Sequence, residues 1–445
     1  MFDFLKGLRK KEKKEQKDEV NTPQKTAEKE VPKQMEKMQT EKAREGFTKV
    51  KKREQNIAAI MEKTGWSREE TLKQLKIAKE EVGCGSYVYA YYGFYNMTKE
   101  EQIETYKKWQ KKQARKERNR DKKLQKCLDV TLAATDWTAE YALEQIEETM
   151  ERTGCTAEEY REYRFWSLTP AEQEKFFLMC HTDIIRRKYS VDLNLSRLIK
   201  DKNEANVYFA KYIDRRWCSN RGTTFEEFSA TFRECSKLFY KPVSSCGGSG
   251  ARPFDISAET MRSVYEQIME LPEGVVEEFV VQHPQLSAMS PNVLNTIRLT
   301  SISYNGPIDA AGNRFVIPYA MLKMGGAKGY VDNLKQGGVG AAIDLETGKL
   351  CTDAVDVDLN TYTHHPVTGM QIQGFQVPYF EEAKAMIRRI VEENSMRGYL
   401  AWDVAITERG PMLIEINGRP SSTLLELPFY NTPLRGRKSV MEKYM

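Results

Sequence analysis

The chain has 445 residues, which is enough for two or three domains with a substantial core. Its 69 Lys and Arg residues against 64 Asp and Glu give a net charge of only +5, and the excess lies near the N-terminus, so no nucleic-acid partner is expected. Eight scattered cysteines without a CxxC pair, and only four histidines, suggest neither a zinc site nor a disulfide framework. With no bilayer-spanning apolar stretch and no secretory signal, we expect a cytoplasmic protein.

The first 50 residues are predicted to be a charged disordered tail with a short amphipathic start. Residues 1–10, MFDFLKGLRK, mix Phe and Leu with Lys and Arg. Such a segment either lies weakly on an anionic membrane, at the inner face, or is a frayed tail with incidental aromatic residues. Residues 11–48 are dominated by Lys, Glu and Gln and read as a tether.

Residues 51–188 are predicted to be all-helical and to contain an internal repeat with an offset of 71 residues. Gly83, Cys84, Tyr89, Tyr92, Phe94, Tyr95, Met97, Thr98, Glu101 and Gln102 recur as Gly154, Cys155, Tyr160, Tyr163, Phe165, Trp166, Leu168, Thr169, Glu172 and Gln173. In each copy the Thr followed three residues later by Glu predicts a capping box that opens a helix. We interpret the aromatic residues as core, with a substrate-docking platform as the alternative. The basic run 107–123 between the copies is expected to be a solvated helix face.

Mixed α/β structure is predicted from residue 189 to residue 445. Lys202 precedes a helix expected over 203–212, and a strand over 237–243 carries Lys241-Pro242 into the loop SSCGGSG, residues 244–250. The serines and glycines of this loop leave backbone N–H groups free to bind phosphate, or form a plain turn. Strands are expected at 274–281 and 292–301, and the second is interrupted by Arg298, whose guanidinium suits a phosphate or carboxylate, or a cross-strand ion pair.

Further strands are expected at 315–323 and 340–343, and an amphipathic helix at 381–393. Between those strands lies a glycine-rich loop, residues 325–340, which contains Asn333. The last hairpin, YLAWDVAITERGPMLIEINGRP over 399–420, turns at Glu408-Arg409-Gly410 and sets Asp403 opposite Glu415.

One face of this hairpin is predicted to be buried, with Leu400, Trp402, Val404, Ile406, Ile414 and Ile416 on it. Facing carboxylates repel unless they share a cation, and Asn417 adds a third oxygen ligand for Mg²⁺. The alternative is the acidic outer face of an ordinary hairpin. A bulge would shift the pairing by one residue.

The hairpin, the Lys-Pro strand and the glycine loop together resemble the ATP-grasp superfamily, in particular its sugar-transfer-associated and glutamate-ligase-like branch, over about residues 192–434. The resemblance implies an α+β fold in which an ATP-grasp domain of two α+β lobes follows the all-α region. It implies ATP and Mg²⁺ as cofactors, and a backbone contact to adenine from the strand between the lobes. The residues implied to contact ATP are Lys202, Lys241, Ser244, Gly247, Gly248, Gly250, Glu277, Glu278, Val280 and Asn333. The implied metal ligands are Asp403, Glu415 and Asn417, and the implied catalytic residues are Arg298 and Lys241.

The activity implied by this resemblance is an ADP-forming carboxylate–amine ligase that works through an acyl phosphate. Its partners would be small-molecule carboxylate and amine substrates, with a cell-surface polysaccharide or its precursor as the modified molecule. Two alternatives stay open. One is a phosphotransferase acting on a hydroxyl, and the other is a non-catalytic interaction protein with a vestigial nucleotide site.

Overall fold

The computed structural model describes residues 50–243, 249–291, 293–326 and 331–445. The membrane-contacting start predicted at residues 1–10 lies outside these ranges, as do Ser244, Gly247 and Gly248. The chain divides into two compact units, Met1–Lys126 and Cys127–Met445, so the division falls within one helix, α5 (Lys99–Ala134). The domain boundaries at 50 and 188 stay a prediction. Among the described residues, no helix combines the length and the apolar character needed to cross a bilayer.

The described part of the first unit is helical and contains the first copy of the repeat. Its elements are a helix over 50–64, α3 (Arg68–Glu81), α4 (Ser86–Tyr92), η3 (Phe94–Asn96) and the start of α5. Its core includes Ile57, Leu75, Tyr89 and Phe94. The predicted capping box is present, because Thr98 N donates to Glu101 Oε2 (2.8 Å) and Glu101 N donates to Thr98 Oγ1 (3.3 Å).

The second copy of the repeat, in the second unit, has the same local structure. Its elements are α6 (Ala139–Thr153), α7 (Ala157–Glu162), η4 (Phe165–Ser167) and α8 (Pro170–Gln173), followed by α9 (Met179–Lys188). Gln173 Nε2 donates to the carbonyls of Phe165 (2.8 Å) and Leu168 (3.1 Å), as Gln102 Nε2 donates to those of Phe94 (2.7 Å) and Met97 (3.2 Å). The aromatic residues of the motif are mainly core, as predicted: Tyr89, Phe94, Tyr160, Tyr163 and Phe165 are all buried.

The second copy packs against the C-terminal segment of the same unit. Phe177 N donates to Glu426 Oε1 (2.5 Å), and the Tyr430 hydroxyl donates to the carbonyl of Tyr163 (2.8 Å). The rings of Phe176 and Tyr430 lie 6.2 Å apart. This helical module therefore shares a buried interface with the region that carries the sheets.

Within residues 189–291 a four-stranded antiparallel sheet of order β1-β4-β2-β3 is the centre of a small lobe, whereas helix residues such as Phe209 and Leu286 pack in the core of the large lobe. The strands are β1 (Trp217–Ser219), β2 (Lys237–Pro242), β3 (Arg252–Asp255) and β4 (Gly274–Glu278). Helices α13 (Phe225–Phe232) and α14 (Met261–Met269) contribute to its core. The remaining helices of this stretch are α10 (Leu193–Leu198), α11 (Lys202–Tyr208), α12 (Ala210–Ile213) and α15 (Pro284–Met289). The helix predicted over 203–212 is thus two short helices that meet at Phe209.

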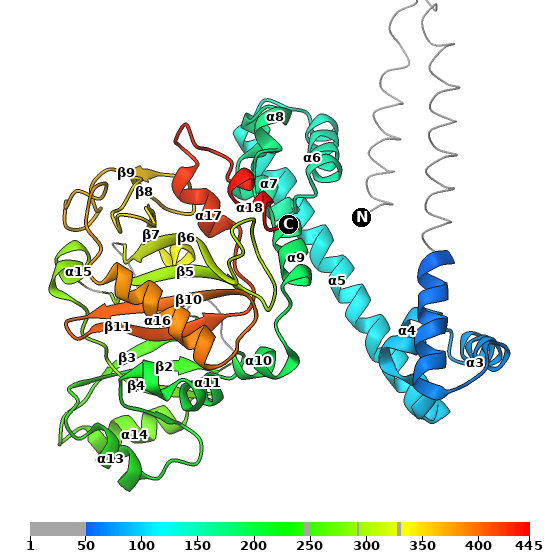
Figure 1. Cartoon of the computed structure of the whole chain (residues 1–445), viewed down its shortest axis with the longest axis horizontal. Coiled ribbons are helices and arrows are strands. Elements are labelled where there is room, and N and C mark those ends of the chain that lie inside the picture. The colour runs from blue at the N-terminus through cyan, green and yellow to red at the C-terminus, as the bar shows by residue number, and fades with distance from the viewer. Residues whose placement is uncertain (1–49, 244–248, 292, 327–330) are drawn as a thin grey trace, which may run out of the picture. The chain divides into compact units, whose positions relative to one another are not determined.

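The large lobe is built on a seven-stranded antiparallel sheet of order β11-β10-β5-β6-β7-β8-β9 (Figure 1). Its strands are β5 (Thr296–Ser303), β6 (Phe315–Met324), β7 (Val339–Ile343), β8 (Ala354–Val355), β9 (Thr361–Tyr362), β10 (Gly398–Thr407) and β11 (Gly410–Asn417). Helix α16 (Phe380–Glu393) lies across β10 and β11 because Phe380, Ala383, Ile387 and Ile390 form a buried stripe at helical spacing (Figure 1). The chain ends with α17 (Thr423–Glu426), η6 (Leu427–Phe429) and α18 (Lys438–Glu442), and η5 (Leu334–Gln336) precedes β7.

The last hairpin pairs Asp403 with Glu415, as predicted, but by a different route. Thr407 pairs with Gly410, so the turn has two residues and not three, and a register shift between Asp403 and Val404 restores the pairing. The shift corrects one predicted core position. Leu413 joins the core of the large lobe, whereas Ile414 lines the cleft on the opposite face.

Candidate functional site

A cleft of about 380 Å³ lies between the two lobes and gathers most of the predicted site residues. Small-lobe and inter-lobe residues in its wall include Lys202, Lys241, Glu277, Glu278 and Val280. Large-lobe residues include Arg298, Asn333, Asp403, Glu415 and Asn417. Gly250, with φ of +77°, is not among the lining residues, but its neighbour Ala251 is. Ser244, Gly247 and Gly248 lie outside the described residues, so their predicted phosphate contacts stay a prediction.

Asp403 on β10 is a buried carboxylate held by two cations. Arg298 on β5 binds it through two parallel hydrogen bonds, Nε to Oδ1 (2.5 Å) and Nη2 to Oδ2 (2.9 Å), and Lys323 Nζ on β6 lies 3.3 Å from Oδ1. Strand pairing explains this contact, since Arg298 lies directly opposite Asp403 in the sheet. Burial opposes ionisation, but Arg298 and Lys323 outweigh it and lower the pKa of Asp403 to about 2.

Lys323 and Asp332 belong to this network and were missed by the sequence analysis. Asp332 is buried, lies 3.4 Å from Lys323 Nζ through Oδ1, and accepts hydrogen bonds from the Thr296 amide (2.9 Å) and hydroxyl. Burial raises the pKa of Asp332, although Lys323 acts in the opposite direction. The available signal was Lys323 itself, a charge that interrupts an apolar strand in the same way as Arg298.

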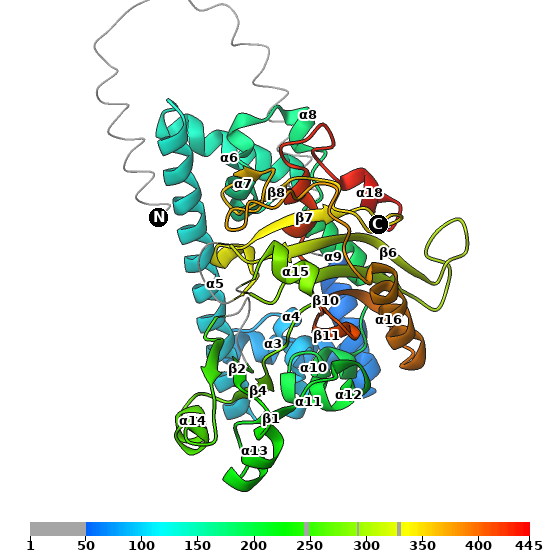
Figure 2. The same ribbon diagram turned by 90° about the vertical axis from the view of Figure 1, so that its left-hand side faces the viewer.

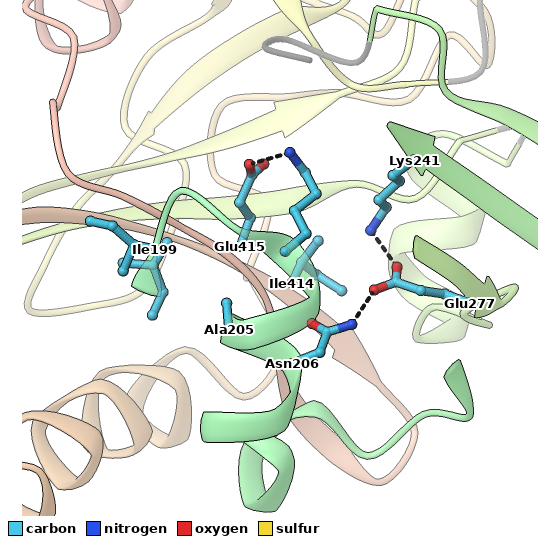
Figure 3. Close-up of a pocket in the computed structure, with 9 residues that line it drawn as sticks. Ile199, Ala205, Asn206, Lys241, Glu277, Ile414 and Glu415 are labelled. Atoms are coloured by element: carbon cyan, nitrogen blue, oxygen red, sulfur yellow. Dashed lines mark hydrogen bonds and ion pairs between the residues drawn. The ribbon is translucent and has the colours of Figure 1, made fainter. Parts of the chain in front are cut away.

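Lys241 on β2 is held by a second buried carboxylate, Glu277 on β4. Its Nζ lies 2.5 Å from Glu277 Oε2, and Asn206 Nδ2 donates to Glu277 Oε1 (3.1 Å) (Figure 3). Arg215 Nη2 also donates to Glu277 Oε1 (2.6 Å). Burial alone would raise the pKa of Glu277, but Arg215 and Lys241 outweigh it, and this pKa lies well below its usual range. Glu277 is therefore a permanent anion that fixes where the ammonium group of Lys241 stands.

Glu415 lies between the two lobes and contacts a small-lobe lysine. Its Oε1 lies 3.5 Å from Nζ of Lys202, the first residue of α11 (Figure 3). Its side chain is 42% exposed, against 7% for Asp403, so Glu415 is the more accessible carboxylate of the pair. Asp201 caps α11 by accepting from Asn203 N (2.9 Å) and Glu204 N (3.3 Å), which fixes the helix start that carries Lys202.

The donor set suits a magnesium ion that is shared with phosphate oxygens. Mg²⁺ usually binds one or two carboxylates together with substrate phosphates. Glu415 is an accessible carboxylate, and Asn417 lines the same cleft, where its amide oxygen would be the second protein ligand. The described ranges contain no group of three His, Cys, Asp or Glu side chains placed for a metal, and both Asp403 oxygens already bind cations. An all-protein metal cage is therefore a poor fit.

Two lobes enclose this cleft, with Lys202 and Lys241 on one side and an antiparallel ribbon that carries Asp403 and Glu415 on the other, and this arrangement is typical of the ATP-grasp class of architecture. Residues 261–442 match the family model described as sugar-transfer associated ATP-grasp. This part of the chain is therefore similar to the sugar-transfer associated ATP-grasp family, and the predicted α+β ATP-grasp fold behind a helical region is confirmed.

Similarity to other proteins is distant. No curated protein sequence matches the chain. Among solved structures, D-alanyl-alanine synthetase A from Vibrio cholerae has 11% identity and a TM-score of 0.34, with 56% of this chain and 65% of that chain covered. D-alanine–D-alanine ligase from Bacillus anthracis has 13% identity and a TM-score of 0.32, with coverage of 59% and 73%. N5-carboxyaminoimidazole synthetase from Staphylococcus aureus, complexed with ADP, has 13% identity and a TM-score of 0.33, with coverage of 55% and 52%. The likeness to the ATP-grasp family rests on the match of residues 261–442, which is less than half of the chain.

Proposed function

We propose that this protein is an ATP- and Mg²⁺-dependent ligase that joins a carboxylate to an amine, with a cell-surface polysaccharide or its precursor as the modified molecule. The observation that carries the proposal is the set of cations gathered in one cleft. Six Lys or Arg side chains stand there among five Asp or Glu, and the cations come from both lobes. The family's sugar-transfer association supports the glycan side of the proposal.

In the first step, an oxygen of the substrate carboxylate bonds to the γ-phosphorus of ATP while the bond from that phosphorus to the bridging oxygen breaks. The products are an acyl phosphate and ADP. Two anionic groups meet in this step, so the protein's task is alignment and charge neutralisation. Lys202 and Lys241 bind the phosphates from the small lobe, and Arg298 stabilises the transferring group from the large lobe. Lys323 acts beside Arg298 on the same side.

The residues that would hold Mg²⁺ in this proposal are Glu415, Asn417 and Asp403, although the Asp403 carboxylate also binds Arg298 and Lys323. Bound Mg²⁺ supplies further neutralisation of the triphosphate. The backbone at Val280, in the inter-lobe segment, contacts adenine, with Glu278 beside it. Asn333 contributes from the large lobe, where its Oδ1 now accepts from Lys335 N (2.9 Å). In the second step, the amine nitrogen bonds to the acyl carbon, the bond from carbon to the phosphate oxygen breaks, and the amine proton leaves to solvent.

The reaction is tested with the full chain, ATP and Mg²⁺ against a panel of amino acids and nucleotide sugars. A ligase forms ADP and phosphate only when both carboxylate and amine are present. With ¹⁸O in the substrate carboxylate, one ¹⁸O atom must appear in the released phosphate. Phosphate retained on the acceptor would establish the phosphotransferase alternative, and no turnover with any pair would favour the non-catalytic alternative.

A matched pair of variants separates the site from general effects of charge. Glu415→Gln removes the accessible carboxylate of the cleft, and we expect turnover to fall by at least about 100-fold while the fold is retained. Glu382→Gln removes an exposed carboxylate on α16 and should leave turnover unchanged. Equal turnover of the Glu415→Gln variant and the unmodified chain would contradict the assignment.

A further inference from the structure

The middle of α5 is a strongly basic stretch of the described residues. Residues 107–126 contain eleven Lys or Arg against two acidic residues, a net charge of +9, whereas the whole chain has only +5. All eleven basic side chains are exposed, and no residue in this stretch is buried. The stretch is one uninterrupted part of a 36-residue helix (Figure 2).

Helical geometry places these charges on one side of α5. At about 100° per residue, ten of the eleven fall within about half of the circumference. We call this set the basic face: Lys107, Lys108, Lys111, Lys112, Arg115, Lys116, Arg118, Lys122, Lys123 and Lys126. The only other residues on this half are Asn119 and Gln125, while Glu117 and Asp121 lie on the opposite half.

Placing so many like charges side by side has an electrostatic cost. Like charges three and four residues apart on a helix repel, each pair by a few tenths of a kcal/mol. Acidic residues spaced between them would remove that repulsion, yet the two acids stand on the far side. Lys108 does pair with Glu104, at 2.6 Å, at one end of the row. An external anionic surface would convert the repulsion into attraction.

We propose that the basic face of α5 docks the protein on an anionic lipid surface. At a rise of about 1.5 Å per residue the row is about 28 Å long, so its cations can meet many headgroups at once on a flat bilayer. The face has no apolar side chain, so the contact is electrostatic and lies at headgroup depth. A duplex nucleic acid fits less well, because the grooves of a duplex curve around its axis, so a straight helix contacts the phosphates with only part of the basic face. The inference does not depend on the proposed ligase activity.

The test measures co-sedimentation of the full chain with vesicles of phosphatidylglycerol in phosphatidylcholine, and with vesicles of phosphatidylcholine alone. One variant changes six cations of the basic face to Gln, a good helix former: Lys107, Lys111, Arg115, Arg118, Lys122 and Lys126. The matched control changes six exposed cations of the second unit to Gln: Arg187, Arg233, Arg314, Lys349, Arg389 and Arg397. Both variants lose the same net charge and keep residues 1–49.

We expect binding to the anionic vesicles only, and binding that weakens as salt rises to about 0.5 M. Because each cation near an anionic surface contributes about fivefold, the basic-face variant should bind at least about 100-fold more weakly, while the control stays within about threefold. Equal weakening of the two variants would overturn the proposal, as would no binding to anionic vesicles. Tighter binding to duplex DNA than to vesicles, at equal phosphate and salt, would also overturn it. Circular dichroism of both variants verifies that α5 is retained.

Discussion

The buried ion pair under Lys241 can be tested by the substitution Glu277→Gln. Glu277 is 5% exposed and its partner Arg215 is 1% exposed, so neither charge has solvent to replace a lost partner. The substitution removes the anion but keeps the shape, and it leaves the guanidinium of Arg215 and the ammonium of Lys241 without a counter-ion. Breaking a buried pair from one side typically costs 3–5 kcal/mol. We expect about 3 kcal/mol here, since Gln still accepts a hydrogen bond from Arg215 and Asn206.

The neighbouring residue provides the control. Glu278→Gln removes a carboxylate that is 36% exposed and 3.9 Å from Arg216, which should change stability by less than about 0.5 kcal/mol. Because the chain has more than one compact unit, the readout is local hydrogen exchange in β1 and β4, which pair directly through Trp217 and Glu277. A loss of about 3 kcal/mol corresponds to exchange about 100-fold faster in these strands.

The two variants also differ in their dependence on pH. The folded pKa of Glu277 is depressed, so its contribution is present above its unfolded pKa of about 4.3 and is lost as pH falls through the folded value. The unmodified chain should therefore lose small-lobe protection in acid more steeply than the Glu277→Gln variant. Equal exchange in the Glu277 and Glu278 variants at neutral pH would refute the electrostatic argument.

Three further substitutions probe other parts of the chain. Burial raises the pKa of Glu426 to about 8. The contribution of this group to stability is therefore complete below about pH 4.3 and is lost as pH rises through 8, by at most about 5 kcal/mol. The difference in unfolding temperature between about pH 6 and about pH 9 should be smaller for Glu426→Gln than for the unmodified chain. Asp403→Asn leaves the buried Arg298 without its carboxylate partner and leaves Lys323 with Asp332 alone, so hydrogen exchange in β5 and β10 should show a loss of about 3 kcal/mol. Unchanged protection would contradict the pairing. At Gly274 an added Cβ would clash with the Tyr240 ring, so Gly274→Ala should destabilise β4 by about 1–3 kcal/mol. Gly85 has open space around it, and Gly85→Ala should therefore change stability by less than about 1 kcal/mol.

Local pattern was enough to find the ribbon and its carboxylates, because alternation and turn residues are properties of neighbouring positions. The strands at β2, β6 and β7, the helix α16 and the capping boxes at Thr98 and Thr169 follow for the same reason. The sequence did not predict that Leu413, and not Ile414, is in the core, because alternation does not reveal where a bulge inserts its extra residue.

The network around Asp403 was only half predictable for a different reason. Arg298 was identified as a charge in an apolar strand, but its partner lies 105 residues away, and only the order of strands β10 and β5 brings the two together. Lys323 is likewise a charged residue in an apolar strand, but it was not predicted to belong to the site. Arg215, in the link between α12 and β1, gave no signal at all, because its role depends on Glu277 being buried 62 residues further on.

The interface between the second helical module and the C-terminal segment bears on how this protein can be shortened. A fragment that begins at residue 189 would remove the Phe177 amide from the buried Glu426 and the Phe176 ring from Tyr430. It would expose an aromatic surface and leave the Glu426 carboxylate, which is buried in the full chain, without the Phe177 hydrogen bond. A fragment for expression should therefore begin no later than Cys127, where the second compact unit starts, even though the matched family segment starts only at residue 261. Helices that precede the sheets in sequence are, in this sense, inseparable from them.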